Sequence, residues 1–180
     1  MKQEYIITIF SEDSIGLLSR ITIIFTRRKI NIDSLTVSAS AIPGIFKFTI
    51  VIKETPDRVH KVVGQLEKVV DVIKAYFNTN EEMICQEIAL YKVPIEELFE
   101  SDKIEKIVRN SGARILEITR EYVVIEKTGL THETQQLFDE LNYFGVTQFN
   151  RSGRVAITRS TIEKLSEFLK ERDSLLEQID

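Results

Sequence analysis

The chain has 180 residues, of which 24 are basic and 28 are acidic, so its formal net charge at pH 7 is −4. This length fits one ordinary domain or two small ones, and a hydrophobic content of 43% suffices to bury a core and argues against disorder. The mild acidity disfavours general nucleic-acid binding, no apolar run approaches the roughly 20 residues that cross a bilayer, and the N-terminus lacks the ordered regions of a signal peptide.

The first half of the chain alternates between strand-like and helix-like patterns. The predicted elements are, in chain order, a strand over 5–10, a helix over 16–28, a strand over 32–38, a strand over 46–52, a helix over 57–70 and a strand over 72–77. Pro43-Gly44 is a turn signal between the second and third strands, and Asp57 is a candidate N-cap of the second helix. The order β-α-β-β-α-β is typical of a ferredoxin-like domain.

A polar stretch over 78–82 predicts a linker, after which the same order repeats. The predicted elements are a strand over 84–93, a helix over 95–111, strands over 114–119 and 122–126, a helix over 131–144, and short strands over 146–149 and 154–158 around a turn at 151–153. Gly112 is expected just past the end of a helix. We therefore predict an α+β protein with two ferredoxin-like βαββαβ domains, at 1–78 and 83–160, and a C-terminal amphipathic helix over 161–180 with apolar residues near heptad spacing.

No catalytic or metal-binding constellation is present in the sequence. His60 and His132 are the only histidines and are predicted on charged helix surfaces, and Cys85 is far from both along the chain. No His/Cys spacing matches a metal site, and neither a P-loop nor a G-x-G-x-x-G pattern occurs. A Cys–His pair formed by folding leaves a small enzyme as an open alternative. The single cysteine cannot form an internal disulfide, which favours a reducing cytoplasm.

The ferredoxin-like order also leaves an RNA-binding sheet open, since such sheets bind RNA through exposed aromatic residues. Phe46 and Phe48 have the spacing of one strand face. Ile50 continues that face, so the pattern equally predicts a buried stripe, and the acidic balance disfavours RNA.

The strongest local signal is the glycine loop, defined as residues 13–18 within the stretch EDSIGLLSR. Asp13 or Ser14 could cap the following helix, and Gly16 permits a sharp turn. The N–H groups of Gly16, Leu17 and Leu18 would then be free at the positive end of the helix dipole. With one glycine and no lysine, such a site suits a small carboxylate better than a polyphosphate.

Nearby residues extend this loop towards a pocket. Ile15, Leu17 and Ile32 could surround an aliphatic side chain, and Asn31 offers an amide that both donates and accepts. Together these groups describe a pocket for an aliphatic amino acid. A tight, empty connection between strand and helix is the alternative, and the residues alone leave both open.

The sequence resembles the regulatory (small) subunits of acetohydroxyacid synthase, also called acetolactate synthase. Four stretches carry the resemblance: SEDSIGLLSRITIIFTRRKINIDSLTVSAS, LEKVVDVIKAY, EIALYKV and FNRSGRVAITR. The NIDSLTV element after the glycine loop is fairly specific, whereas the later stretches match more loosely. The resemblance spans Tyr5 to Arg159, and the final helix looks longer than is usual for the family.

The resemblance implies an N-terminal ACT domain that pairs side by side with a second copy and binds an effector at the interface. One copy would contribute Asp13, Ser14, Ile15, Gly16, Leu17 and Leu18, and the other would contribute Asn31 and Ile32. The family's usual effector is valine, the end product of the pathway, so this chain is expected to bind valine or another branched-chain amino acid. The implied partner is a separate large catalytic subunit that holds thiamine diphosphate, magnesium and FAD. This chain would activate that subunit and confer feedback inhibition without cofactors or catalysis of its own.

One departure concerns Asp13, where the family commonly has Asn. An ionised Asp attracts the ligand's ammonium and repels its carboxylate. The change therefore bears on valine sensitivity and not on the activating role. A free-standing ACT sensor that controls another enzyme or a transcription factor is the alternative function.

Overall fold

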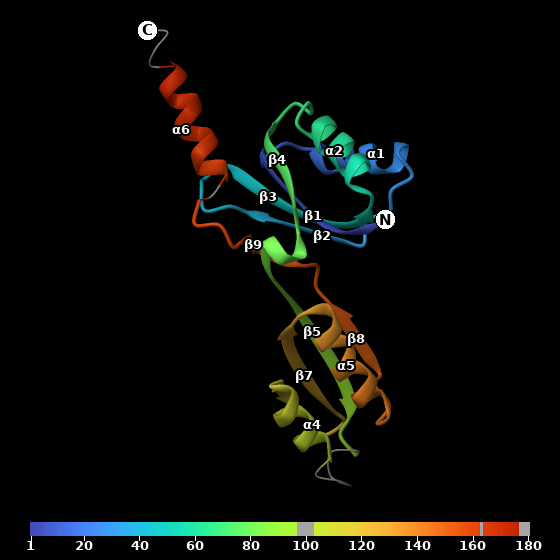
Figure 1. Cartoon of the computed structure of the whole chain (residues 1–180). Helices are drawn as coiled ribbons and strands as arrows, with labels where there is room; N and C mark the ends of the chain where they lie inside the picture. Colours follow the sequence, from blue (N-terminus) through green and yellow to red (C-terminus); the bar gives the residue numbers. More distant parts are fainter. Residues whose placement is uncertain (97–102, 163, 177–180) are drawn as a thin grey trace. The chain divides into compact units, whose positions relative to one another are not determined.

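A computed structural model describes residues 1–96, 103–162 and 164–176, with side chains up to Lys170 (Figure 1). The chain folds into two compact units. The first comprises residues 1–84 together with 156–180, and the second comprises residues 85–155. In the described part of the chain, no helix is long and apolar enough to span a membrane.

The first unit contains a four-stranded antiparallel sheet in the order β2-β3-β1-β4. Its elements are β1 (Gln3–Glu12), α1 (Leu17–Arg27), β2 (Ser34–Ala39), β3 (Ile45–Glu54), α2 (Pro56–Leu66) and β4 (Val72–Thr79). Both helices cover the same face of the sheet, as Figure 1 shows. The predicted β-α-β-β-α-β order and all six predicted elements are confirmed, with shifts of a few residues at the ends.

The core of this unit lies between the sheet and the two helices. Alternate β1 residues Tyr5, Ile7 and Ile9 point towards the helices and meet Ile21 and Phe25 of α1 there. Burying such aliphatic and aromatic side chains contributes about 1.5–3 kcal/mol each. Because this packing depends on the two-residue and 3.6-residue periods, the core could be predicted from the pattern.

Part of the opposite face of the same sheet is covered by α6 (Lys164–Leu176), which follows β9 (Val155–Thr158) in the chain. Leu165, in α6, is buried against Phe10 of β1 and Tyr76 of β4. The predicted boundaries, 1–78, 83–160 and 161–180, differ from this division, since residues 156–180 belong to the compact unit of the first domain. The physical reason is the burial of apolar α6 residues on that sheet face, which α1 and α2 leave open.

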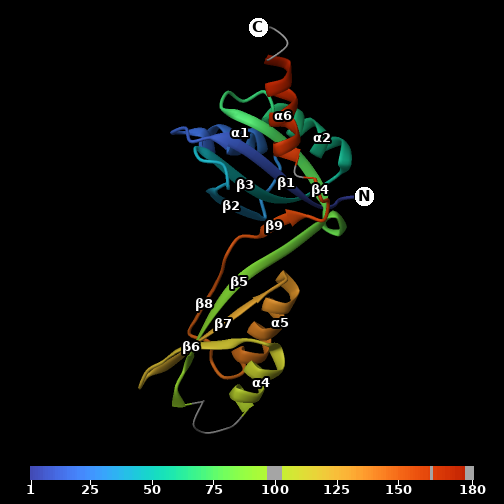
Figure 2. The same cartoon turned by 90° about the vertical axis from the view of Figure 1, so that its left-hand side faces the viewer.

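The second unit repeats the fold. Its elements are β5 (Met83–Pro94), α4 (Lys103–Ser111), β6 (Arg114–Ile118), β7 (Tyr122–Gly129), α5 (Thr131–Asn142) and β8 (Gln148–Arg151), and its sheet order is β6-β7-β5-β8. β9 (Val155–Thr158) follows, and all but its first residue belong to the first unit. The segment at 151–153 therefore separates β8 from β9. Figure 2 shows α4 and α5 on one face of this sheet, and Gly112 has φ +66° just past α4, as predicted.

Two local predictions are wrong, and parts of two predicted helices lie outside what the structure describes. Residues 78–82 are not a plain linker: β4 continues to Thr79, and Asn80–Glu82 form a short 3-10 helix in which Glu82 Oε2 accepts the Thr79 N–H at 2.7 Å. Asp57 does not cap α2, because Thr55 is the N-cap and Pro56 begins the helix. The part of the predicted 95–111 helix over 97–102 lies outside the described residues, as do the side chains beyond Lys170 on the predicted heptad stripe.

Candidate functional site

The glycine loop connects β1 to α1 in the first unit. Gly16 is the residue that precedes α1, and its φ is +80°, a left-handed conformation that side chains other than glycine rarely adopt. The Arg20 N–H donates to Gly16 O at 3.2 Å and starts the helical ladder. The N–H groups of Leu18 and Ser19 come before this bond, so the helix itself supplies no acceptor for them. The predicted sharp turn at Gly16 is confirmed.

The predicted capping by Asp13 or Ser14 is wrong, because no side chain caps this helix. Instead, Ser14 contributes its carbonyl oxygen, which accepts the Leu17 N–H at 3.2 Å. The sequence had suggested that the Leu17 N–H is free, and this prediction is wrong because the N–H donates to Ser14 O. The cause is the glycine turn, which brings the backbone of Ser14 over the first helical residue.

The Ser14 hydroxyl has a different role. It accepts a hydrogen bond from Arg20 Nη2 at 3.1 Å, and the same nitrogen lies 2.6 Å from Asp71 Oδ2. Arg20 Nη1 donates to Val70 O at 3.3 Å. The Arg20 hydrogen bond, followed by the Ser14 hydroxyl, lowers the pKa of Asp71 below its ordinary value. The loop is thus tied to the residues that precede β4.

Sequence reasoning missed both Arg20 and Asp71. Arg20 follows Gly16 by four residues, so it lies on the loop's side of the first helical turn, and this spacing is the signal that could have found it. Asp71 is 51 residues further along the chain, and no local pattern connects it to the loop.

The predicted pocket residues differ in exposure. Ile15 is fully exposed and Leu18 is 45% exposed, while Leu17 is 2% exposed and belongs to the core of the first unit. The Leu17 side chain therefore cannot line a ligand pocket as expected, because it faces the sheet. Asp13 and Gly16 are exposed, and Ser14 is half-buried.

Asn31 and Ile32 lie beyond the other end of α1. Asn31 is exposed and donates from Nδ2 to Asp33 Oδ1 at 2.8 Å, and Ile32 packs partly against the core. At a rise of about 1.5 Å per residue, a helix of this length separates them from the glycine loop by roughly 16 Å. A single chain therefore does not bring the two predicted halves of the site together.

The two histidines are exposed, and Cys85 is buried. The His60 ring packs edge-on against Phe77, with the centroids 4.7 Å apart. Within the described residues, no group of three or more His, Cys, Asp or Glu side chains could hold a metal ion. Phe48 is 4% exposed and lies in the core, so it belongs to a buried stripe instead of an RNA-binding face.

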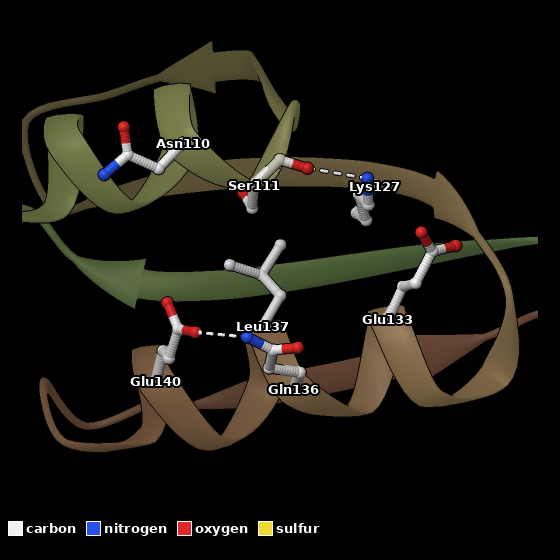
Figure 3. A pocket seen from close by; sticks show the side chains of 7 residues that line it. All are labelled: Asn110, Ser111, Lys127, Glu133, Gln136, Leu137 and Glu140. Carbon is white, nitrogen blue, oxygen red and sulfur yellow. Dashed lines mark hydrogen bonds between the residues drawn. The ribbon is translucent and has the colours of Figure 1, made fainter.

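A pocket in the second unit lies between α4, β7 and α5 and has a volume of about 290 Å³ (Figure 3). It is lined by Asn110, Ser111, Lys127, Glu133, Gln136, Leu137 and Glu140. Lys127 Nζ donates to Ser111 O at 2.6 Å, at the end of α4, and Glu133 Oε2 accepts the Leu130 N–H at 2.6 Å, before α5. These charges satisfy helix termini, which is a structural use of the pocket's polar groups.

The motif FNRSGRVAITR builds a buried ionic cluster around Glu87 of β5. Glu87 is 6% exposed, and its Oε1 accepts the Thr131 hydroxyl at 2.5 Å. Arg154 Nε lies 3.4 Å from Oε1, and Arg151 Nε lies 3.5 Å from Oε2. The two guanidinium groups hold the segment between β8 and β9 against the N-terminus of α5.

Comparisons with known proteins agree with this architecture. A family model described as the small subunit of acetolactate synthase matches residues 86–160, and one described as an AHAS small subunit-like ACT domain matches residues 7–74. The chain is 32% identical to the acetolactate synthase small subunit of Bacillus subtilis, over 89% of this chain and 94% of that protein. It is 31% identical to the probable acetolactate synthase small subunit of Archaeoglobus fulgidus, over 87% of this chain and 97% of that protein.

A solved structure has the same fold. The crystal structure of the acetolactate synthase small subunit from Thermotoga maritima matches with a TM-score of 0.80 and 26% identity, covering 89% of this chain and 99% of that chain. The resemblance inferred from the sequence is therefore confirmed, and this chain belongs to the family of acetolactate synthase small subunits, with an ACT domain at residues 7–74.

Proposed function

We propose that this chain is the regulatory subunit of an acetolactate synthase in the biosynthesis of valine, leucine and isoleucine. It binds a separate large catalytic subunit, raises the rate of that subunit and makes it respond to an amino-acid effector. The observation that carries the proposal is the glycine loop, an exposed turn at a helix N-terminus within an ACT domain whose relatives are small subunits of this synthase.

The effector site forms between two copies of the ACT domain. The donors at Gly16 and Leu18 in one copy meet the effector carboxylate, and Asn31 and Ile32 of the other copy close the pocket. Two observations support this arrangement: the single chain leaves the two halves at opposite ends of α1, and the Ile15 side chain is fully exposed and available for a partner to cover.

Valine is the proposed effector because the apolar side chains of Ile15, Leu18 and Ile32 suit an aliphatic ligand. Leu17 contributes core packing that holds the first turn of α1, and Ser14 contributes through its hydrogen bond with Arg20. Asp13 is exposed next to the carboxylate end of the site and weakens valine binding through like-charge repulsion.

The chemistry of the synthase belongs to the partner. Thiamine diphosphate, magnesium and FAD are expected in the large catalytic subunit, and this chain is proposed to hold no cofactor and to have no turnover of its own. Its place is the cytoplasm, without a nucleic-acid or membrane partner.

The test measures acetolactate formation by the matching large subunit with and without this chain, and with increasing valine. We expect no product from this chain alone, a higher rate with both chains, and inhibition by valine only when both are present. Equal rates with and without this chain would refute the activating role. Recovery of a different partner from the native cytoplasm would favour a free-standing ACT sensor.

Isothermal titration with valine, leucine and isoleucine identifies the effector separately from activation. We expect all three to bind at two equivalent sites per ACT-domain pair, because each copy contributes one loop and one Asn31–Ile32 segment, with valine the tightest. Affinity and rate are measured independently. A subunit that activates but binds none of the three amino acids would support the activating role and refute the effector site.

A further inference from the structure

α6 lies outside both family matches, the later of which ends at residue 160. It nevertheless packs on the ACT sheet of its own chain. Leu165 is 1% exposed and forms an apolar cluster with Phe10 and Tyr76, to which Ile73 and Leu169 add partly buried surface. A segment beyond the family matches is thus built into the first unit.

Basic and aromatic side chains extend this contact along β4. Lys164 Nζ lies 4.6 Å from the ring centroid of Tyr76, and Lys74 Nζ lies 5.6 Å from that of Phe168. Cation–π contacts of this kind add an electrostatic attraction to the apolar contact. Together with Leu165, they hold α6 against the first half of β4.

The contact surface lies at the end of the sheet from which the glycine loop leaves. Phe10 comes two residues before the end of β1, and β4 has an irregular register opposite it: Phe10 pairs with Lys74, and the next residue, Ser11, pairs with Val72. Ile73 is the extra residue of this bulge, and it packs in the α6 cluster. Bulges re-aim side chains and depend on their surroundings, and here α6 supplies part of those surroundings.

The bulge leads directly to the anchor of the loop. Asp71 immediately precedes β4 and has φ +74°, a left-handed conformation that is unusual for a residue other than glycine. Its carbonyl oxygen accepts the Glu12 N–H at 2.9 Å, and its carboxylate receives Arg20, which also bonds Ser14. Such a conformation persists only where surrounding contacts fix it.

We infer that α6 is a positioning element for the glycine loop: its packing on Phe10 and on the bulge of β4 fixes Asp71, and Asp71 fixes Arg20 and Ser14. The consequence for effector binding rests on the proposed function, whereas the ordering of the loop does not. Loosening α6 makes the loop more mobile, so an effector must order it on binding and binds more weakly.

Hydrogen exchange of backbone amides, measured without ligand in the unaltered protein and in its variants, tests the ordering of the loop directly. A chain that ends after Ser160 and the variant Leu165→Ala should exchange faster at residues 12–18 and 71–74 than the unaltered protein, by about fivefold or more. Leu165→Met keeps the buried volume and should restore slow exchange. Ile162→Ala is the matched control, since it removes a similar side chain from the same segment where that side chain is 56% exposed.

Two results would overturn the inference. One is unchanged exchange at residues 12–18 in both the truncated chain and Leu165→Ala. The other is an equal increase in α2, which would mean that α6 stabilises the whole unit without favouring the loop. Titration with valine then separates this inference from the proposed function: we expect an affinity loss of about fivefold in Leu165→Ala with activation retained. If the unaltered protein binds no effector but its loop still responds to truncation, the effector site fails and the positioning role stands.

Discussion

Arg20 Nη2 lies 2.6 Å from Asp71 Oδ2 and 3.1 Å from Ser14 Oγ, so one guanidinium joins the first turn of α1, the glycine loop and the start of β4. The side chains of the ion pair are partly exposed, at 40% for Arg20 and 23% for Asp71. Solvent screens such a pair, so it contributes little to the stability of the fold. Its role is to fix the position of the glycine loop relative to the sheet.

The first prediction concerns this pair. Asp71→Asn removes the carboxylate charge but keeps a side chain that tolerates the left-handed conformation, so the fold and the thermal midpoint should change little. Arg20 loses its ionic partner, the loop becomes less ordered, and valine affinity should fall several-fold in isothermal titration.

The matched control for this prediction is Arg109→Gln. It removes a guanidinium from an exposed ion pair in the second unit, where Arg109 Nη2 lies 2.7 Å from Glu105 Oε1. Its valine affinity should match that of the unaltered protein. Equal losses in the two variants would show that the Arg20–Asp71 pair has no special relation to the loop.

The second prediction compares Gly16→Asp with Gly16→Asn. A side chain at Gly16 would meet nothing within 4 Å in the single chain, but φ is +80°. Asp and Asn both tolerate that conformation better than other residues, so each variant should fold and activate the large subunit. The added carboxylate opposes the effector carboxylate, so Gly16→Asp should abolish valine inhibition.

Because Asp and Asn have nearly the same shape, the pair separates charge from bulk. Gly16→Asn should retain part of the valine affinity, as measured by calorimetry. If Gly16→Asp bound valine as tightly as the unaltered protein, the glycine loop would not be the effector site.

The fold and the turn could be predicted from the sequence because both depend on local pattern. Alternation in β1, helical spacing in α1 and the need for a left-handed residue at Gly16 all lie within a few residues. The capping prediction failed because the Ser14 hydroxyl accepts a hydrogen bond from Arg20 and does not cap the helix. The glycine turn instead brings the Ser14 carbonyl oxygen to the Leu17 N–H.

The parts that could not be predicted depend on contacts between distant residues. Arg20 meets Asp71, 51 residues away, only after β1 and β4 have paired. Leu165 lies in the predicted amphipathic helix. Periodicity predicts which face of that helix is apolar, but it does not predict which sheet that face packs against. The same limit applies to Leu17, whose position at the loop suggested a ligand contact while its side chain completes the core.

The third prediction concerns Asp13. Asp13→Asn removes an exposed negative charge beside the proposed carboxylate position and should tighten valine binding. The improvement should shrink as salt is added, because exposed charges are screened over about 8–10 Å at physiological ionic strength. Titration of valine at low and high salt measures both effects.

Glu12→Gln is the control for the third prediction, since Glu12 is also an exposed acidic residue and is next to Asp13 in the chain. It should change valine affinity much less. A similar gain in both variants would indicate a general effect of net charge, and weaker binding by Asp13→Asn would assign Asp13 to the effector's ammonium group.

The fourth prediction concerns the buried cluster of the second unit. Glu87→Ala leaves Arg151 and Arg154 partly buried, at 26% and 12% exposed, without their shared carboxylate. Breaking a buried pair in this way costs about 3–5 kcal/mol. Urea unfolding should therefore show a large loss of stability, whereas Glu105→Ala, in an exposed pair with Arg109, should stay within about 0.5 kcal/mol.

Glu87→Gln completes this comparison. It keeps an acceptor for the Thr131 hydroxyl, whose oxygen lies 2.5 Å from Glu87 Oε1, and should be less damaging than Glu87→Ala. If Glu87→Ala matched Glu105→Ala, the cluster would contribute no more than an exposed ion pair.

The fifth prediction concerns pH and Glu54, at the end of β3. Its carboxylate is 2% exposed, and its Oε1 accepts Lys2 Nζ at 2.6 Å and Arg58 Nη1 at 2.8 Å. The hydrogen bond from Lys2 is the main cause that lowers the pKa of Glu54 from its ordinary value of 4.5, although burial opposes the shift. The Thr55 N–H and Arg58 lower this pKa further.

A lowered pKa in the folded state means that the unfolded chain binds more protons in the interval between the two pKa values. The stability that Glu54 contributes is therefore fully present above its ordinary pKa of 4.5 and is lost as the pH falls through its lower folded pKa. Glu54→Gln should be less stable than the unaltered protein at pH 7, and the difference should narrow below pH 4.5. Thermal midpoints measured from pH 7 to pH 3, with Glu12→Gln as an exposed control, check this. Parallel curves for Glu54→Gln and the unaltered protein would show that the ionised Glu54 carboxylate does not stabilise the fold.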